Sequence, residues 1–267
     1  MLFRSGAGRY VDDIVLPGMA HGAVLHSPHA HARIKSVDTS KAKDAPGVLL
    51  VLTGADAAAD KLGAYTAAMM PEDIGAPKGH RTHLPVLQAE TVRFVGDRVA
   101  FVVAETQAQA LDAADLIEVE YDTLPAVGTV EDAAKDGAPK VWPDNPQGNT
   151  AFILAFGDEK ATEAAFARAK HVVKLRTVNN RLTPVSMEPR TAIGDYNGAD
   201  DFFTLYTSSQ NPHGVRQEMA GLLHVSENQL RVVAPDVGGG FGLKGGSFPD
   251  DVLVLWASKK LRRSNIH

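Results

Sequence analysis

The chain has 267 residues, of which 44% are hydrophobic and 22% charged, and its formal net charge is -5. This length suits one large domain or two ordinary ones, and the mildly acidic balance argues against a nucleic-acid-binding surface. Cysteine is absent from the sequence, which excludes disulfides, cysteine-ligated iron–sulfur clusters and thiolate catalysis within this chain. No run approaches the roughly 18 apolar residues of a membrane helix, and the first residues lack the apolar core of a signal peptide. We therefore expect no membrane span and a cytoplasmic protein.

Strands and short helices are expected to alternate in the first part of the chain. Apolar runs predict buried strands at 22–25 and 48–52, with a short helical turn at 38–43 between them that Pro46-Gly47 ends. Residues 57–91 mix glycine, proline and methionine without a period, which indicates a long exposed excursion.

The pattern becomes sharper after residue 91. Valine-rich residues 93–104 are interrupted by Gly96-Asp97, which predicts a hairpin. Thr106, with Gln109 three residues later, has the capping-box signature of a helix N-terminus. Residues 117–121 alternate apolar and acidic side chains, as a half-buried strand does. The buried face of the intervening helix is expected to hold Ala110, Leu111 and Ala114.

A domain boundary is predicted where the composition becomes linker-like. Residues 129–149 are rich in aspartate, proline, asparagine and glycine. The sequence thus predicts a first domain at 5–128, a linker at 129–149 and a second domain at 150–267. We expect the first domain to fold as a unit separable from the second.

The second domain is expected to begin with an alanine-rich helix at 159–169 and a strand at 171–177. Two apolar runs, at 192–196 and 202–207, predict a hairpin about Asn197-Gly198. Asn211-Pro212 supplies the N-cap and the first residue of a further helix. A last helix at 250–260 places three apolar residues on one side, and we expect them to lack a complete layer to pack on; they are Val252, Leu255 and Trp256.

The most informative motif is the glycine-rich turn, residues 238–246, between a strand-like run at 230–234 and the last helix. Glycine lets the backbone come close to a ligand, and a helix start can add N–H donors for an anion. We expect Phe241 to project into the same ligand space. A P-loop is excluded, because Lys244 is followed by glycine. Residues 240–245 satisfy G-x-G-x-x-G, so a Rossmann dinucleotide site and an ordinary glycine turn stay open as alternatives.

Gln210 is the second candidate site residue. It ends a predicted strand just before a helix, at the kind of edge where open α/β layers hold ligands. Because the glycine-rich turn also follows a strand, we expect Gln210 to lie close to Phe241. His29 and His31 would share one face of a strand, but no companion ligands lie nearby, so no metal-ligating residue is predicted.

Four stretches together resemble the large, molybdopterin-binding subunit of the molybdenum hydroxylases, the family of xanthine dehydrogenase, aldehyde oxidase and aerobic carbon monoxide dehydrogenase. They occur in the family's order and span nearly the whole chain. The stretches are residues 8–13 with 27–34, residues 95–100 with 113–121, residues 187–190, and residues 209–213 with 238–242.

The resemblance implies a mixed α/β (α+β) fold, with an α/β hammerhead domain at 5–128 and the incomplete start of the first molybdopterin-binding domain at 150–267. It also implies that Gln210 lies near the apical oxo ligand of molybdenum and acts with Phe241 in catalysis. The cofactor-binding residues would be Gln210, Gly239, Gly240, Phe241 and Gly242. The family's general-base glutamate lies far downstream and is not present here, so we expect this chain alone to be inactive.

The activity implied is oxidation of an aldehyde, CO or an N-heterocycle with oxygen from water. The implied cofactor is molybdenum–molybdopterin in its cytosine dinucleotide form, with [2Fe–2S] and FAD on partner subunits and a dimer of heterotrimers as the full-length parent. Gly245 stands where purine-oxidising members carry a glutamate, which disfavours xanthine. A truncated non-catalytic fragment and a Rossmann-type dehydrogenase remain the alternatives.

Overall fold

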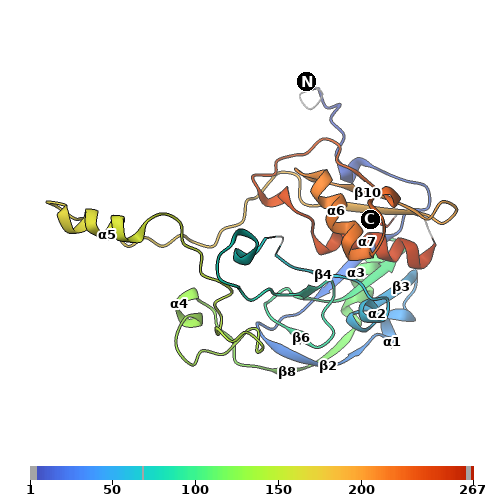
Figure 1. Ribbon diagram of the computed structural model, residues 1–267. Coiled ribbons are helices and arrows are strands. Elements are labelled where there is room, and N and C mark those ends of the chain that lie inside the picture. Colours follow the sequence, from blue (N-terminus) through green and yellow to red (C-terminus); the bar gives the residue numbers. More distant parts are fainter. Residues whose placement is uncertain (1–4, 68, 263–265) are drawn as a thin grey trace.

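The computed structural model describes residues 5–67, 69–262 and 266–267. It shows a body of packed sheets and helices from which one long arm projects (Figure 1). The described strands form three three-stranded sheets and one two-stranded sheet, β4 (Ala64–Tyr65) with β5 (Leu84–Pro85). Within the described residues, four short 3-10 helices join these elements: η2 (Val11–Asp13), η3 (Pro71–Ile74), η4 (Glu227–Gln229) and η5 (Leu243–Gly245). The expected mixed α/β class is confirmed.

The first sheet has the order β1-β7-β3 and is antiparallel throughout. Its central strand β7 (Arg98–Ala104) is buried along nearly its whole length between β1 (His21–His26) and β3 (Val48–Thr53). Helices α1 (Ser40–Lys43) and α2 (Gly54–Ala59) flank β3.

Helix α3 (Gln107–Asp115) covers the first sheet, and Thr106 is its N-cap, as predicted: its Oγ1 accepts from the Gln109 N–H at 3.3 Å. The predicted buried face is partly wrong. Leu111 is 54% exposed, whereas Ala113 is fully buried with its neighbours Ala110 and Ala114. Small side chains on this face let the helix lie close to the sheet.

The second sheet has the order β6-β2-β8. Strand β2 (Ala32–Asp38) pairs with β8 (Glu118–Thr123) along its length and with β6 (Thr91–Val92) at its start. The hairpin predicted about Gly96-Asp97 is therefore wrong, because β6 and β7 belong to different sheets. Asp97 builds this turn instead: its buried carboxylate accepts from Gln88 Nε2 at 3.1 Å and from the Arg93 N–H at 3.0 Å. A side chain, and not a strand ladder, fixes the turn.

The excursion predicted at 57–91 is irregular, but it is not exposed throughout. Four of its residues have 2% of their surface exposed or less: Met70, Val86, Leu87 and Gln88. This segment therefore contributes to the core between the sheets.

The third sheet has the order β11-β10-β9. Strand β10 (Phe202–Thr207) runs antiparallel to β9 (Ala192–Asn197), which confirms the predicted hairpin, and parallel to β11 (Leu230–Val233). Helix α6 (Pro212–Leu223) makes the crossover between the two parallel strands. Asn211 caps it as predicted, with Oδ1 accepting from the Gly214 N–H at 3.1 Å.

Helix α7 (Pro249–Leu261) is buried from residue 251 to residue 258, as a helix enclosed on all sides must be. The expectation that Val252, Leu255 and Trp256 lack a complete layer is wrong, because they are 0, 0 and 4% exposed. The first sheet supplies the missing layer: one hydrophobic cluster joins Phe101 and Val103 of β7 to α7 and the third sheet. The predicted domains thus share a core.

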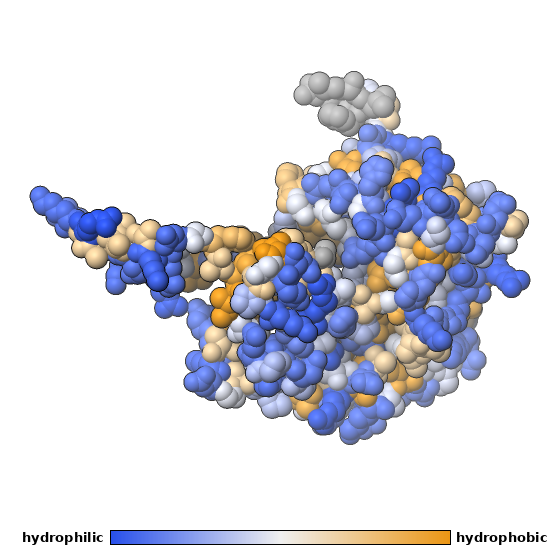
Figure 2. All heavy atoms as spheres, in the orientation of Figure 1, coloured by the Kyte–Doolittle hydropathy of each residue, from blue (hydrophilic) through white to orange (hydrophobic). Residues whose placement is uncertain are grey.

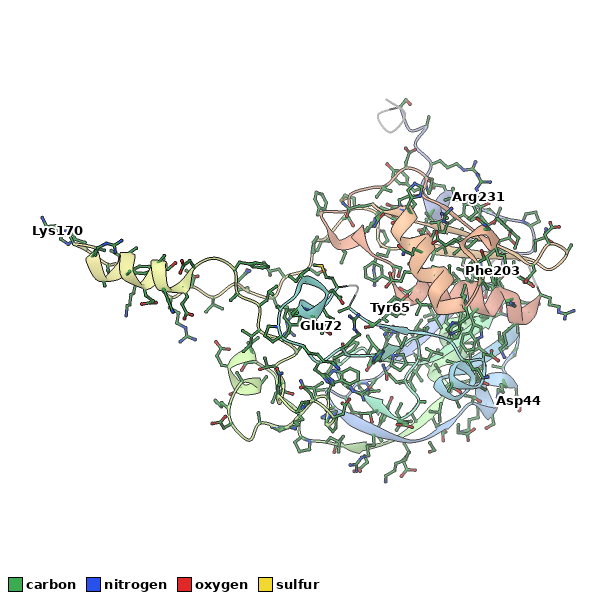
Figure 3. All side chains as sticks on the ribbon, viewed as in Figure 1. Asp44, Tyr65, Glu72, Lys170, Phe203 and Arg231 are labelled. Carbon is green, nitrogen blue, oxygen red and sulfur yellow. The ribbon has the colours of Figure 1, made fainter. Side chains whose placement is uncertain are left out.

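An arm formed by residues 150–187 leaves the body and carries α5 (Glu159–Arg168), with Lys170 at its tip (Figures 1 and 3). It follows α4 (Val130–Ala133). The predicted helix is confirmed, but the strand predicted at 171–177 is wrong, since the described residues offer it no ladder partner. A strand needs a paired neighbour to be stable. Hydrophobic residues gather along the arm and where it joins the body (Figure 2); the most exposed are Phe156, Val173, Leu175, Leu182, Val185 and Met187.

We expect limited trypsin digestion to cut first in the arm, after Lys170 or Lys174, because both lie in exposed backbone without ladder hydrogen bonds. Mass spectrometry of the earliest fragments gives the sites. A first cut after Arg98, at the start of buried β7, would contradict this expectation.

Within the described ranges, no helix combines the length and hydrophobicity that crossing a bilayer requires.

Candidate functional site

The site is built where two parallel strands end. Strands β10 and β11 point the same way, so the residues after each strand meet at one edge of the third sheet. Gln210 comes after β10, and the glycine-rich turn comes after β11. The Gln210 side-chain Oε1 accepts from the Gly242 N–H at 3.0 Å, and the Gln210 N–H donates to the Lys244 carbonyl at 2.8 Å. The prediction that Gln210 and the glycine-rich turn meet at one edge of the sheet is confirmed, through Gly242 and Lys244. A contact between Gln210 and the Phe241 side chain stays a prediction.

The turn has a strained backbone at its tip. Gly239 and Gly242 have φ of +99° and +87°, which glycine adopts without penalty. Phe241 also lies in the left-handed region, with φ of +50°, although it is a bulky residue. Such a conformation costs about 1–3 kcal/mol and is concentrated at functional sites. Phe241 is 74% exposed, so burial of its side chain does not offset this strain within the described chain.

Backbone donors are available at this tip. Among the described residues, the N–H groups of Gly239, Gly240 and Phe241 meet no acceptor. Successive N–H groups around left-handed residues form concave sites for anions and other acceptors. Gln210 adds its Nε2, because its Oε1 is already engaged by Gly242.

The structural reason for glycine differs between positions of the turn, and at some of them it does not involve space. A Cβ on Gly240 would overlap the Cδ and Oε1 atoms of Gln210, and a Cβ on Gly238 would lie 2.5 Å from the Glu188 Cβ. A Cβ on Gly242 would meet nothing within 4 Å. A side chain at Gly240 would therefore displace Gln210 before it reached any ligand space.

A buried ionic network beneath the turn was missed by the sequence interpretation. Lys244 is completely buried and contacts Glu188 and Ser208. The only available signal was a lysine inside a glycine-rich turn with no acidic residue near it in sequence. The other oxygen of Glu188, Oε1, is buried without a hydrogen-bond partner among the described residues.

The histidines singled out in the sequence have ordinary surroundings. His29 packs edge-on against Tyr121, with ring centroids 4.7 Å apart, and His31 Nδ1 lies 2.9 Å from the Pro125 carbonyl. Within the part of the chain that the structure describes, no three His, Asp or Glu side chains are placed to bind a metal ion.

A cavity of about 310 Å³ lies beside the strand ends and is lined in part by Thr207, Arg190 and Asp251. Asp251 is 3% exposed, and its Oδ2 accepts from the Phe248 N–H at 2.8 Å, which starts α7. Burial raises the pKa of this carboxyl from 3.8 to about 6. A fraction of the Asp251 side chains is therefore protonated slightly below neutral pH.

Replacing Asp251 with asparagine is expected to stabilise the chain above pH 6. The folded-state pKa exceeds the unfolded value, so the contribution of Asp251 is fully present below pH 4 and is lost as the pH rises through about 6. The pKa shift from 3.8 to about 6 corresponds to about 3 kcal/mol of lost folding stability at high pH. Thermal unfolding at pH 4, 6 and 8 should show a Tm advantage of Asp251→Asn that grows with pH. Exposed Asp112→Asn is the control; an advantage independent of pH would refute the assignment.

Two family models match the chain. Residues 5–125 match the aldehyde oxidase and xanthine dehydrogenase a/b hammerhead domain, and residues 142–265 match the molybdopterin cofactor-binding domain. The domain limits predicted from composition remain predictions.

Known proteins resemble nearly the whole chain. The carbon monoxide dehydrogenase large chain of Afipia carboxidovorans is 36% identical over 96% of this chain and 32% of its own length. The nicotine 6-hydroxylase large subunit of Paenarthrobacter nicotinovorans is 36% identical, over 97% and 30% respectively. The crystal structure of quinoline 2-oxidoreductase from Pseudomonas putida 86 superposes with a TM-score of 0.89 at 37% identity, over 99% of this chain and 33% of that one. This chain thus spans about a third of the length of these relatives.

Proposed function

This chain belongs to the family of molybdenum hydroxylase large subunits, and from that premise we propose that Gln210 and the glycine-rich turn form one wall of a molybdopterin site. The observation that carries the proposal is the strained, exposed tip of the turn. Its backbone N–H groups meet no acceptor in the described part of the chain and lie beside the Gln210 amide. The residues in the proposed wall are Gln210, Gly239, Gly240, Phe241 and Gly242.

The donor set suits such a cofactor. A molybdenum–molybdopterin carries oxo, sulfur and phosphate acceptors, and the wall offers the N–H groups of the turn together with the Gln210 Nε2. None of these groups is a metal ligand, so the wall would hold the cofactor by hydrogen bonds. When bound, the molybdenum–molybdopterin supplies the transfer of water-derived oxygen to the substrate and accepts the electrons released.

The chain's own residues would position the cofactor and shield the reacting centre from water. Gln210 can donate and accept hydrogen bonds without a change of charge, which suits it to orient a polar group at the metal throughout a reaction. Its orientation is fixed by the Gly242 N–H. The exposed ring of Phe241 would cover the reacting centre and exclude water from one side.

The activity of the whole enzyme is proposed from the similarity of this chain to relatives whose names refer to carbon monoxide, nicotine and quinoline. We propose that an enzyme containing this chain oxidises an aldehyde, CO or an N-heterocycle. One relative is named as a subunit of a dehydrogenase complex, which supports the existence of partner subunits. We propose that these partners carry [2Fe–2S] and FAD and receive the electrons. The cytosine dinucleotide form, the dimer of heterotrimers, the cytoplasmic location and the inactivity of this chain alone stay predictions from sequence.

Gln210→Ala tests the role of the wall. In the assembled enzyme we expect most of the molybdenum to be retained and turnover to fall by about 10- to 100-fold, the usual loss when a group that orients a metal centre is removed. Molybdenum is measured by mass spectrometry beside dye-linked substrate oxidation. Gln217→Ala, on the exposed side of α6, is the matched control. Unchanged turnover in Gln210→Ala would refute the assigned role.

A further inference from the structure

A lysine beneath the glycine-rich turn has none of its surface exposed. Lysine is almost never fully buried unless it is paired, and the side chain of Lys244 is 0% exposed. Its Nζ donates to Glu188 Oε2 at 2.8 Å, to the Glu188 carbonyl at 2.9 Å and to Ser208 Oγ at 2.7 Å. The three donors of the ammonium group thus have three acceptors.

Glu188 joins both ends of the turn. Its Oε2 accepts from Lys244 at the end of the turn and from the Gly238 N–H, at 2.7 Å, at the beginning. The same oxygen accepts from Ser208 Oγ at 2.6 Å, just after strand β10. Burial opposes ionisation, but the hydrogen bonds from Lys244, Ser208 and Gly238 together keep the pKa of Glu188 below its ordinary value. One carboxylate therefore fixes the turn at two points and fastens it to the strand end.

The network encloses the strained part of the chain. Between the two anchored residues lie Gly239, Phe241 and Gly242, all in left-handed conformations. A strained conformation persists only where the surrounding structure over-determines it. Among the described residues, the hydrogen-bond partners of Lys244 and Glu188 belong to the turn, to residues 186–188 or to residues 208–210 just after β10.

Resting on the proposed cofactor role of the turn, we propose that Lys244 and Glu188 are positioning residues. The buried pair holds the turn closed, so that its N–H groups face the cofactor and the Gly242 N–H meets Gln210. A buried ion pair that only stabilises the fold would have a different effect when removed. The positioning role predicts that the turn changes locally in a variant whose overall fold is intact.

Three variants separate the two roles: Lys244→Met, Glu188→Gln and the double variant. Lys244→Met leaves a buried carboxylate without its partner, so we expect a marked fall in Tm. The double variant buries no net charge, and we expect its Tm to recover most of that loss. Lys135→Met, which removes an exposed lysine paired with Asp132, is the control and should change nothing.

The decisive readout is hydrogen exchange of the 238–246 peptide in the 267-residue chain without cofactor, measured on the double variant. We expect exchange to be roughly tenfold faster than in the unsubstituted chain, while exchange in β7 is unchanged. The molybdenum content of the assembled enzyme should fall in the same variant. Unchanged exchange in the turn would overturn the positioning role. Faster exchange with full molybdenum content would instead overturn the cofactor role of the turn.

Discussion

Gly240→Val should leave the assembled enzyme without molybdenum. The new Cβ would overlap Cδ and Oε1 of Gln210, so the glutamine side chain must move away. Its hydrogen bond from the Gly242 N–H is then broken. The backbone of the turn, with its own N–H donors, must also shift, which Gln210→Ala does not require. Loss of such supporting contacts costs about 10- to 100-fold in metal retention, and we expect the upper end of this range because the backbone also shifts. Mass spectrometry gives the molybdenum content per polypeptide.

Two further glycine variants serve as comparisons for Gly240→Val. A Cβ on Gly221, in helix α6, meets nothing within 4 Å, so Gly221→Ala should retain all of the molybdenum. A Cβ on Gly242 also meets nothing within 4 Å, but its φ of +87° strains any other residue, so Gly242→Ala should have an intermediate effect. Wild-type molybdenum in Gly240→Val would remove the cofactor assignment and reopen the Rossmann and ordinary-turn alternatives.

Leu255→Ala should lower the free energy of unfolding by about 2–5 kcal/mol, the usual range for a buried leucine. Leu255 is fully buried in the cluster that joins α7 to the hammerhead sheet. Because that core is shared, the hammerhead should lose stability with the second domain, in one transition. Circular dichroism gives the Tm, and hydrogen exchange in β7 reports on the hammerhead.

Leu111→Ala is the matched control for the core variant. Leu111 is 54% exposed on helix α3, so its loss should change stability by about 0.5 kcal/mol or less. If Leu255→Ala speeds exchange in the third sheet but not in β7, the two domains unfold independently, as the separable first domain predicted from composition would do.

Signals that depend on neighbouring residues in the sequence predicted the structure well. Asn211-Pro212 starts α6 and Thr106 starts α3, because a helix cap is made by a side chain and an N–H a few residues away. The meeting of Gln210 with the glycine-rich turn could also be predicted, since parallel strands bring their ends to one edge.

Features that depend on distant partners could not be predicted in this way. The valine run around Gly96-Asp97 contains no signal that β6 pairs with β2, and not with β7. The alternating residues 171–177 predict a strand, but a strand requires a partner that the described chain does not provide. Lys244 and Glu188 are 56 residues apart, and only the fold shows that they form a buried pair.

The central claim is that the tip of the glycine-rich turn contacts a molybdopterin. A structure of the molybdenum-loaded enzyme containing this chain tests it most directly. We predict cofactor density within hydrogen-bonding distance of the N–H groups of Gly239, Gly240 and Phe241, with the Gln210 amide beside the metal. Cofactor density elsewhere, with these N–H groups facing only solvent, would contradict the claim.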